Sequence, residues 1–307
     1  MRLFSMFFLL FFISTTAIAE QPFVDWIAKY RDQRQNKIAD FALPQGVRLI
    51  KNISYGHHPR HKMDVYLPRK SKNAPVILMV HGGAWFMGNK AGHGVVENKV
   101  KHWVRKGFIL ISVNYRLLPE AEPLTQAKDV AKALAFAQKK VRVWGGNPAK
   151  FILMGHSAGG HLVSILATSP LLIRQKGGKP WLGTVSIDTA AYDVSKIMEE
   201  KHFRFYNKAF GTNPVYWKKI SPYYRLKQAG HPFLAICSTR RNNACAQATR
   251  FVKKAHTFAM SATVLPVNLT HNQANKALGK QNKYTATVDN FLLTLDPLLK
   301  RLLKNTH

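Results

Sequence analysis

Short apolar runs alternate with longer amphipathic segments along most of the chain. Runs of apolar and β-branched residues between turn residues predict strands at 47–55, 62–67, 75–80, 108–114, 151–155, 183–188, 232–237 and 262–268. Apolar residues at helical spacing predict helices at 95–106, 125–142, 158–168, 246–258 and 284–303. Parallel strands need crossover connections, which these helices supply, so the pattern predicts an α/β fold with a mostly parallel eight-stranded sheet.

The connection between the sixth and seventh predicted strands, residues 189–231, is unusually long. Long insertions at this level often form a lid or cap over a ligand pocket. Its aromatic side chains are candidates to line such a pocket, although we expect most of them to pack onto the sheet. They are Phe203, Phe205, Tyr206, Phe210, Tyr216, Trp217, Tyr223 and Tyr224.

Residues 1–19 have the pattern of a secretory signal peptide. Arg2 is followed by an apolar run at 3–13 and by Ala17-Ile18-Ala19, a typical cleavage site before Glu20. The apolar run is shorter than the roughly 20 residues that span a bilayer, and no later run is longer. We therefore expect one domain over residues 20–307, without a transmembrane segment, that is exported to the periplasm or secreted.

The chain has two cysteines, Cys237 and Cys245, at the end of a predicted strand and just before a predicted helix. In an oxidising compartment a close, even pair of cysteines typically forms a disulfide. We expect this bond in the exported protein, with two reduced buried thiols as the alternative.

The net charge is +31, from 46 basic and 15 acidic residues. Such a charge favours an anionic surface, an acidic polysaccharide or an acidic substrate as a partner. The chain has no nucleic-acid-binding motif, so we expect no nucleic acid, and it has no glycine-rich phosphate loop, so we expect no cofactor. His57, His58 and His61 cluster in a predicted solvated hairpin where no carboxylate or cysteine completes a site, and we expect no metal there.

The strand 151–155 leads into Gly155-His156-Ser157-Ala158-Gly159, and the helix 158–168 follows at once. A strand, a sharp Gly-x-Ser-x-Gly turn and a helix are typical of a nucleophile elbow, in which the glycines permit a strained turn that raises the serine hydroxyl above the sheet. An ordinary glycine-rich turn is the weaker interpretation because of the flanking elements. Ser157 is therefore the candidate nucleophile of a serine hydrolase.

A second motif, His81-Gly82-Gly83-Ala84-Trp85, follows the strand 75–80. A His-Gly-Gly loop at this distance before the elbow is typical of an oxyanion hole, where fixed backbone N–H groups stabilise the charge that develops in acyl transfer. The candidate donors are the N–H groups of Gly83 and Ala84, with that of Ala158 after the nucleophile.

These motifs resemble those of the α/β-hydrolase superfamily, in its hormone-sensitive-lipase-like and feruloyl or acetyl esterase-like (BD-FAE-like) group. Val113-Asn114-Tyr115-Arg116-Leu117 adds to the resemblance, which covers roughly residues 47–296. It implies a carboxylesterase with an α/β-hydrolase fold and a cap insertion after the sixth strand.

The candidate general base is His271, just past the last predicted strand. In α/β-hydrolases the triad order along the chain is Ser, then Asp or Glu, then His. Catalytic loops also gather at the carboxyl ends of the strands in α/β sheets. Both arguments favour His271 over the other histidines that follow Ser157.

The triad acid stays open between two interpretations. The resemblance implies an acid in the loop after the strand 232–237, but no carboxylate occurs between Glu200 and Asp289. The preferred interpretation places it at Asp188, where the preceding strand ends, with Asp193 in reserve. The alternative assigns the role to Asn243 or Asn242, because an amide can orient a histidine although it adds no charge.

Together these features predict an exported serine carboxylesterase that hydrolyses small acyl esters through an acyl-enzyme. Its expected partner is a small-molecule ester. The alternatives are a small amidase, because the resemblance extends to formamidases with a similar His-Gly-Gly loop, and a catalytically degenerate binding protein that keeps the hydrolase fold.

Overall fold

The computed structural model describes residues 41–304 of the chain. The predicted signal peptide, residues 1–19, lies outside the described residues. Within them, eight strands form one sheet in the order β1-β2-β4-β3-β5-β6-β7-β8. Their bounds are β1 Arg48–Ser54, β2 Lys62–Leu67, β3 Ala74–Val80, β4 Ile109–Val113, β5 Gly146–His156, β6 Gly183–Ile187, β7 Phe233–Ser238 and β8 Ala262–Val267.

The sheet is antiparallel at one edge and parallel elsewhere, which confirms the prediction of a mostly parallel sheet. β2 pairs antiparallel with both β1 and β4, and every pairing from β4 to β8 is parallel. β3 and β5 lie at the centre, where Ile77 pairs with Leu110 of β4 and with Ile152 of β5. All parallel strands therefore end at the same edge of the sheet, which brings their following loops together.

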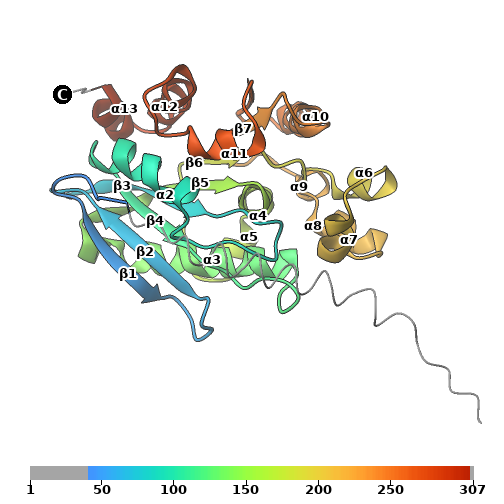
Figure 1. Cartoon of the computed structure of the whole chain (residues 1–307), viewed down its shortest axis with the longest axis horizontal. Helices are drawn as coiled ribbons and strands as arrows, with labels where there is room; N and C mark the ends of the chain where they lie inside the picture. Colours follow the sequence, from blue (N-terminus) through green and yellow to red (C-terminus); the bar gives the residue numbers. More distant parts are fainter. Residues whose placement is uncertain (1–40, 305–307) are drawn as a thin grey trace, which may run out of the picture.

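Each face of the sheet is covered by helices. Along β3, Val76, Leu78 and Val80 point into one apolar core, and Ile77 and Met79 point into the other. The first core includes α3 (Pro123–Lys140), α4 (Ala158–Ala167) and α10 (Ala244–Thr257). The second includes the segment from α2 (His93–Lys99) into the π-helical η1 (Val100–Val104), together with α11 (His271–Lys276), α12 (Lys283–Leu295) and α13 (Pro297–Lys304). Figure 1 shows α12 and α13 on the opposite side of the sheet from α3.

Three predicted elements differ in detail from the structure. The strand predicted at 151–155 begins earlier, at Gly146, and the helix predicted at 95–106 begins at His93 and turns π-helical. The single helix predicted at 284–303 is two helices, because Asp296 is extended before Pro297. A residue before proline disfavours the α-helical conformation, which explains the break.

The insertion 189–231 contains four short helices: α6 Val194–Glu199, α7 Arg204–Phe210, α8 Pro214–Ile220 and α9 Pro222–Arg225. They gather at one end of the molecule (Figure 1). The shorter pieces elsewhere are η2 (Val141–Trp144) and α5 (Leu171–Arg174). None of the helices between residues 41 and 304 has both the length and the apolar character that a membrane crossing needs.

The turn between β1 and β2 is less solvated than the sequence suggests. His61 is only 6% exposed, and its Nε2 lies 3.1 Å from Asp129 Oδ2 of α3. His58 Nε2 lies 2.6 Å from Glu120 Oε1. These carboxylates come from elsewhere in the chain, so the local sequence does not reveal them. Nevertheless, residues 41–304 contain no group of three or more side chains that could hold a metal ion.

Candidate active site

Ser157 forms a sharp turn between β5 and α4. Its φ is 56° and its ψ is −119°, a strained conformation for a residue with a side chain. Its N–H donates to the carbonyl of Ile187 at the end of β6 (2.9 Å), which fixes the turn against the neighbouring strand. The Ser157 side chain is partly exposed, whereas its neighbours are buried.

Close packing explains the two glycines of this turn. A Cβ on Gly155 would lie 2.3 Å from the carbonyl oxygen of Gly159, and a Cβ on Gly159 would lie 2.3 Å from that of Val80. Real Cβ atoms do not approach backbone this closely. The glycines therefore let α4 begin directly against the ends of β5 and β3, as the elbow pattern predicts.

The His-Gly-Gly loop lies beside the turn. Gly83 has a φ of +125°, and a Cβ there would lie 2.1 Å from the carbonyl oxygen of Met87. The Gly83 carbonyl accepts from the N–H groups of Phe86 and Met87, which closes a tight loop. The N–H groups of Gly83, Ala84 and Ala158 have no acceptor among residues 41–304, and all three residues line the same cavity as Ser157. This is the arrangement an oxyanion hole needs.

His271 is the first residue of α11, a helix that the sequence pattern does not predict. A capping box fixes its position: Thr270 Oγ1 accepts from the N–H of Gln273, and Gln273 Oε1 accepts from the N–H of Thr270. His271 Nε2 lies 2.9 Å from Ser157 Oγ. It is thus within hydrogen-bond distance of the predicted nucleophile.

Asp188 contacts the other side of the His271 ring and completes a row of three side chains, Ser157, His271 and Asp188. Its Oδ2 lies 2.6 Å from His271 Nδ1. A carboxylate only accepts, so Nδ1 carries the proton and Nε2 is left to accept from the serine hydroxyl. The structure thus places Asp188 in the position of a triad acid.

The alternative acid is elsewhere. Asn243 is the exposed N-cap of α10, with a φ of 64°, and its amide has no bond to His271. Asp193, the reserve candidate, caps α6 by accepting from the N–H of Lys196 and is paired with Arg250. The loop after β7 thus does not bring the amide of Asn243 to the histidine, and the geometry favours Asp188.

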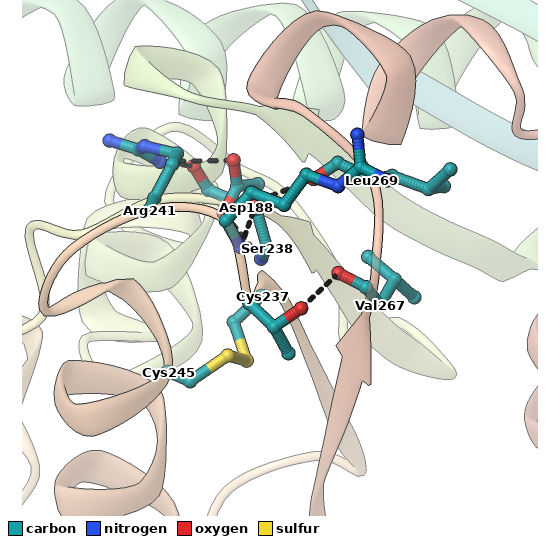
Figure 2. Close-up of a disulfide and its surroundings, with 9 residues drawn as sticks. Asp188, Cys237, Ser238, Arg241, Cys245, Val267 and Leu269 are labelled. Carbon is teal, nitrogen blue, oxygen red and sulfur yellow. Dashed lines mark hydrogen bonds and ion pairs between the residues drawn. A yellow bond between two sulfur atoms is a disulfide. The ribbon is translucent and has the colours of Figure 1, made fainter.

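That loop nevertheless contributes to the site. The N–H of Ser238 donates to Asp188 Oδ1 (2.8 Å), and Arg241 Nη1 donates to the Asp188 carbonyl (2.7 Å) and pairs with Oδ2 (3.0 Å). A disulfide between Cys237 and Cys245 closes the loop at its base, with a Cα separation of 5.1 Å. Figure 2 shows the disulfide, Ser238 and Arg241 around Asp188. The resemblance implies that this loop supplies the triad acid. Instead, the loop binds Asp188, which directly follows β6.

Two opposing effects set the ionisation of Asp188. Its side chain is fully buried, and burial disfavours the charged form. The hydrogen bond from His271, the charge of Arg241 and the N–H of Ser238 outweigh burial and hold the pKa of Asp188 below its ordinary value. Asp188 is therefore ionised at neutral pH.

A second histidine supports His271. The Nε2–H of His156 donates to the His271 carbonyl (3.0 Å), and the two rings are 4.5 Å apart. Burial and the nearby His271 lower the pKa of His156 well below its ordinary value. His156 is thus a neutral donor that positions the base.

These residues open into one cavity of about 1150 Å³. Phe203, Phe205 and Tyr206 of the insertion line it, so part of the aromatic set does face the site. Phe210 is buried instead, 4.7 Å from the ring of Trp85. The insertion therefore forms a wall of the cavity.

Sequence reasoning missed two contributors. Arg241 is one of two adjacent arginines in the loop after β7, and a cation in this loop is a signal for a carboxylate partner. His156 is the variable residue of the Gly-x-Ser-x-Gly pattern, which carries no signal for its bond to His271.

Comparisons with known proteins agree with this geometry. The model of the BD-FAE family matches residues 63–177. A probable isoprenylcysteine alpha-carbonyl methylesterase of Oryza sativa subsp. japonica is 25% identical over 183 residues, which are 58% of this chain and 44% of that protein. The carboxylesterase NlhH of Mycobacterium tuberculosis (strain CDC 1551 / Oshkosh) is 34% identical over 148 residues, which are 48% of this chain and 45% of that protein. The chain thus spans less than half the length of these two relatives.

The fold is also found among solved structures. Esterase B from Lactobacillus Rhamnosis superposes with a TM-score of 0.71 at 21% identity, over 93% of this chain and 96% of that one. The order of the strands, the turn at Ser157, the His-Gly-Gly loop and the match to the family model all indicate the same fold. The chain has an α/β-hydrolase fold, and residues 63–177 are similar to the BD-FAE family.

Proposed function

We propose that this protein is a serine carboxylesterase that hydrolyses small acyl esters through an acyl-enzyme. The observation that carries the proposal is the continuous row from Asp188 through His271 to Ser157, with distances of 2.6 Å and 2.9 Å. Relatives named as esterases support it, and so does the position of the row at the carboxyl ends of the parallel strands.

In the first step Ser157 Oγ attacks the ester carbonyl carbon while His271 Nε2 takes its proton. The tetrahedral oxyanion is bound by the N–H groups of Gly83, Ala84 and Ala158. The bond to the leaving oxygen then breaks, and His271 returns the proton to the alcohol. Asp188 keeps the imidazole in the required tautomer and stabilises its charged form.

In the second step water replaces the alcohol. His271 Nε2 takes a proton from the water, whose oxygen attacks the acyl carbon of the acyl-enzyme. The same N–H groups bind the second oxyanion, and the bond to Ser157 Oγ breaks as His271 returns the proton to the serine. The products are the free acid, the alcohol and the unchanged protein.

The test is hydrolysis of p-nitrophenyl acetate and butyrate by the protein, by Ser157→Ala and by His271→Ala. We expect either variant to lower kcat by about 10³-fold or more, because the two residues act as a unit. Ser261→Ala is the matched control, because Ser261 is exposed at the opposite, amino-terminal edge of the sheet, and it should keep full activity. Equal turnover by the protein and Ser157→Ala would leave a binding protein on a hydrolase fold.

Export is a further part of the proposal. The oxidised pair Cys237 and Cys245 suits an oxidising compartment, as does the signal-peptide pattern of residues 1–19. Expression of the full chain in a bacterial host, followed by mass spectrometry of the periplasmic fraction, should give a protein that begins at Glu20. A protein that keeps Met1 in the cytoplasm would contradict export.

A further inference from the structure

The charges around the cavity are strongly unbalanced. Among the described residues that line it, Asp188 is the single carboxylate, whereas Arg60, Arg241 and Lys276 supply three basic side chains. Asp188 is fully buried and is already paired with Arg241 and His271. Its negative charge offsets one of the three positive charges, so the wall of the cavity keeps a net positive charge.

Beside Asp188, the guanidinium of Arg241 has N–H donors that do not contact this carboxylate. Both of its contacts with Asp188 use the same nitrogen, Nη1. A guanidinium has five N–H donors in a planar fork, and it stays charged at every accessible pH. Tyr206 takes a further hydrogen bond from the Arg241 side chain, which is 26% exposed and lines the cavity, so the remaining N–H donors can reach a bound molecule.

Lys276 lines the same cavity from a different segment of the chain. It ends α11, the helix that begins with His271, and its side chain lies over Gly94 of α2, where a Cβ would be 3.0 Å from Lys276 Cγ. Lys276 is exposed, and its ammonium has no ion pair among residues 41–304. The carboxylate of α2, Glu97, is bound by Lys101 and by His93 instead.

We propose that this site takes esters that carry a carboxylate near the scissile bond, with Arg241 and Lys276 as the residues that select them. The inference rests on the esterase function proposed above. Two cations in the wall of a partly enclosed cavity attract an anion more strongly than the same charges on an open surface, because the low-dielectric walls concentrate the field. The net charge of +31 adds long-range attraction in the same sense.

The experiment compares esters that differ by the presence of one carboxylate. On the acyl side the pair is mono-p-nitrophenyl adipate and p-nitrophenyl hexanoate, which have acyl chains of equal length. On the alcohol side the pair is para-acetoxybenzoate and phenyl acetate. For each pair the measured quantity is the ratio of kcat/KM for the anionic ester to kcat/KM for the neutral one. The ratio cancels any loss of chemistry common to both esters.

We expect the protein to favour the anionic ester in at least one pair, by about 10-fold at low salt, and salt to lower this preference. The pair that shows it identifies the side of the ester that faces the cations. Arg241→Met and Lys276→Met should each reduce the ratio by about 3-fold or more, because each removes one of the selecting charges.

Two matched controls remove the same charge nearby. Arg240→Met removes an exposed arginine from the same loop, whose Nε binds Asn268 Oδ1, and Lys280→Met removes an exposed lysine just beyond α11. Both should leave the ratio unchanged. Ratios at or below one in both pairs, or equal ratios in the test and control variants, would overturn this inference alone. A lack of Ser157-dependent turnover with all four esters would overturn the esterase function and this inference with it.

Discussion

Asp188 owes its role to an uncommon backbone conformation. Its φ is 49°, in the left-handed region, and its N–H donates to the carbonyl of Ile236 on the neighbouring strand. A non-glycine residue in this region is strained and persists only where its surroundings fix it. Here Ser238 and Arg241 fix the carboxylate, so that it meets His271 although it comes from β6.

Replacement of this acid tests the assignment directly. Asp188→Asn should lower kcat for p-nitrophenyl acetate by about 10³- to 10⁴-fold, because the amide favours the wrong tautomer of His271 and adds no charge. Asn243→Ala should leave kcat within about 2-fold, since Asn243 has no contact with His271. A large loss in Asn243→Ala with retained activity in Asp188→Asn would reverse the assignment.

At the level of elements, the sequence predicts the strands better than their connections. Seven of the eight strands match their predicted bounds within one residue, because runs of apolar and β-branched residues between turn residues mark the strands. The short helix α11 is missed, because its Thr270 and Gln273 capping box precedes only six residues with no apolar period. Local patterns are therefore sufficient for these strands, and they are insufficient where a cap defines the element.

The site follows the same division. Ser157 and the His-Gly-Gly loop are found from sequence because their function depends on local backbone conformation. The pairing of Asp188 with His271 spans 83 positions and depends on which loop holds the carboxylate. No local pattern records that contact, so the sequence leaves Asp188 and Asn243 as alternatives.

The loop closed by the disulfide holds Asp188 in place. Removal of the disulfide therefore gives a second prediction. The double variant Cys237→Ala/Cys245→Ala should lose about 2.5 kcal/mol in its free energy of unfolding, the loop-closure value for a loop of this length. It should also lose activity while folded, because Ser238 and Arg241 are less well fixed around Asp188. Urea unfolding gives the first quantity, and kcat well below the unfolding midpoint gives the second.

A folded double variant with unchanged kcat would show that the strands alone position Ser238 and Arg241. The matched control is Arg240→Ala, a change at an exposed residue of the same loop that leaves the disulfide intact. Its activity on neutral esters should stay close to that of the unchanged protein.

At the scale of the whole molecule, two helices of the second core meet near the catalytic edge through a buried lysine. Lys99, at the end of α2, is 1% exposed and has no carboxylate partner among residues 41–304. Its ammonium donates to the carbonyls of Gly94 and Asn275 and to Asn275 Oδ1, at 2.9 to 3.1 Å. It thereby ties α2 to α11, the helix that carries His271.

Burial lowers the pKa of Lys99 from 10.5 to about 7, so the unfolded chain binds more protons than the folded one between these values. The free energy of unfolding contributed by this group must therefore rise with pH across that window and level off below it. Relative to Lys99→Met, the protein should gain on the order of 4 kcal/mol between about pH 6 and about pH 10. Urea unfolding of both proteins at several pH values measures the difference.

Lys140→Met, at an exposed lysine of α3, should instead give a curve parallel to that of the protein. If the curve of unfolding free energy against pH for Lys99→Met were parallel as well, burial of the charged Lys99 would cost no free energy. Its three carbonyl partners would then fully replace water. A rising difference means that the protein tolerates a destabilising buried charge at the point where α2 meets α11. The benefit is then that Lys99 holds α11, and with it His271, in place through its hydrogen bonds to Asn275. An apolar residue at position 99 cannot form these bonds.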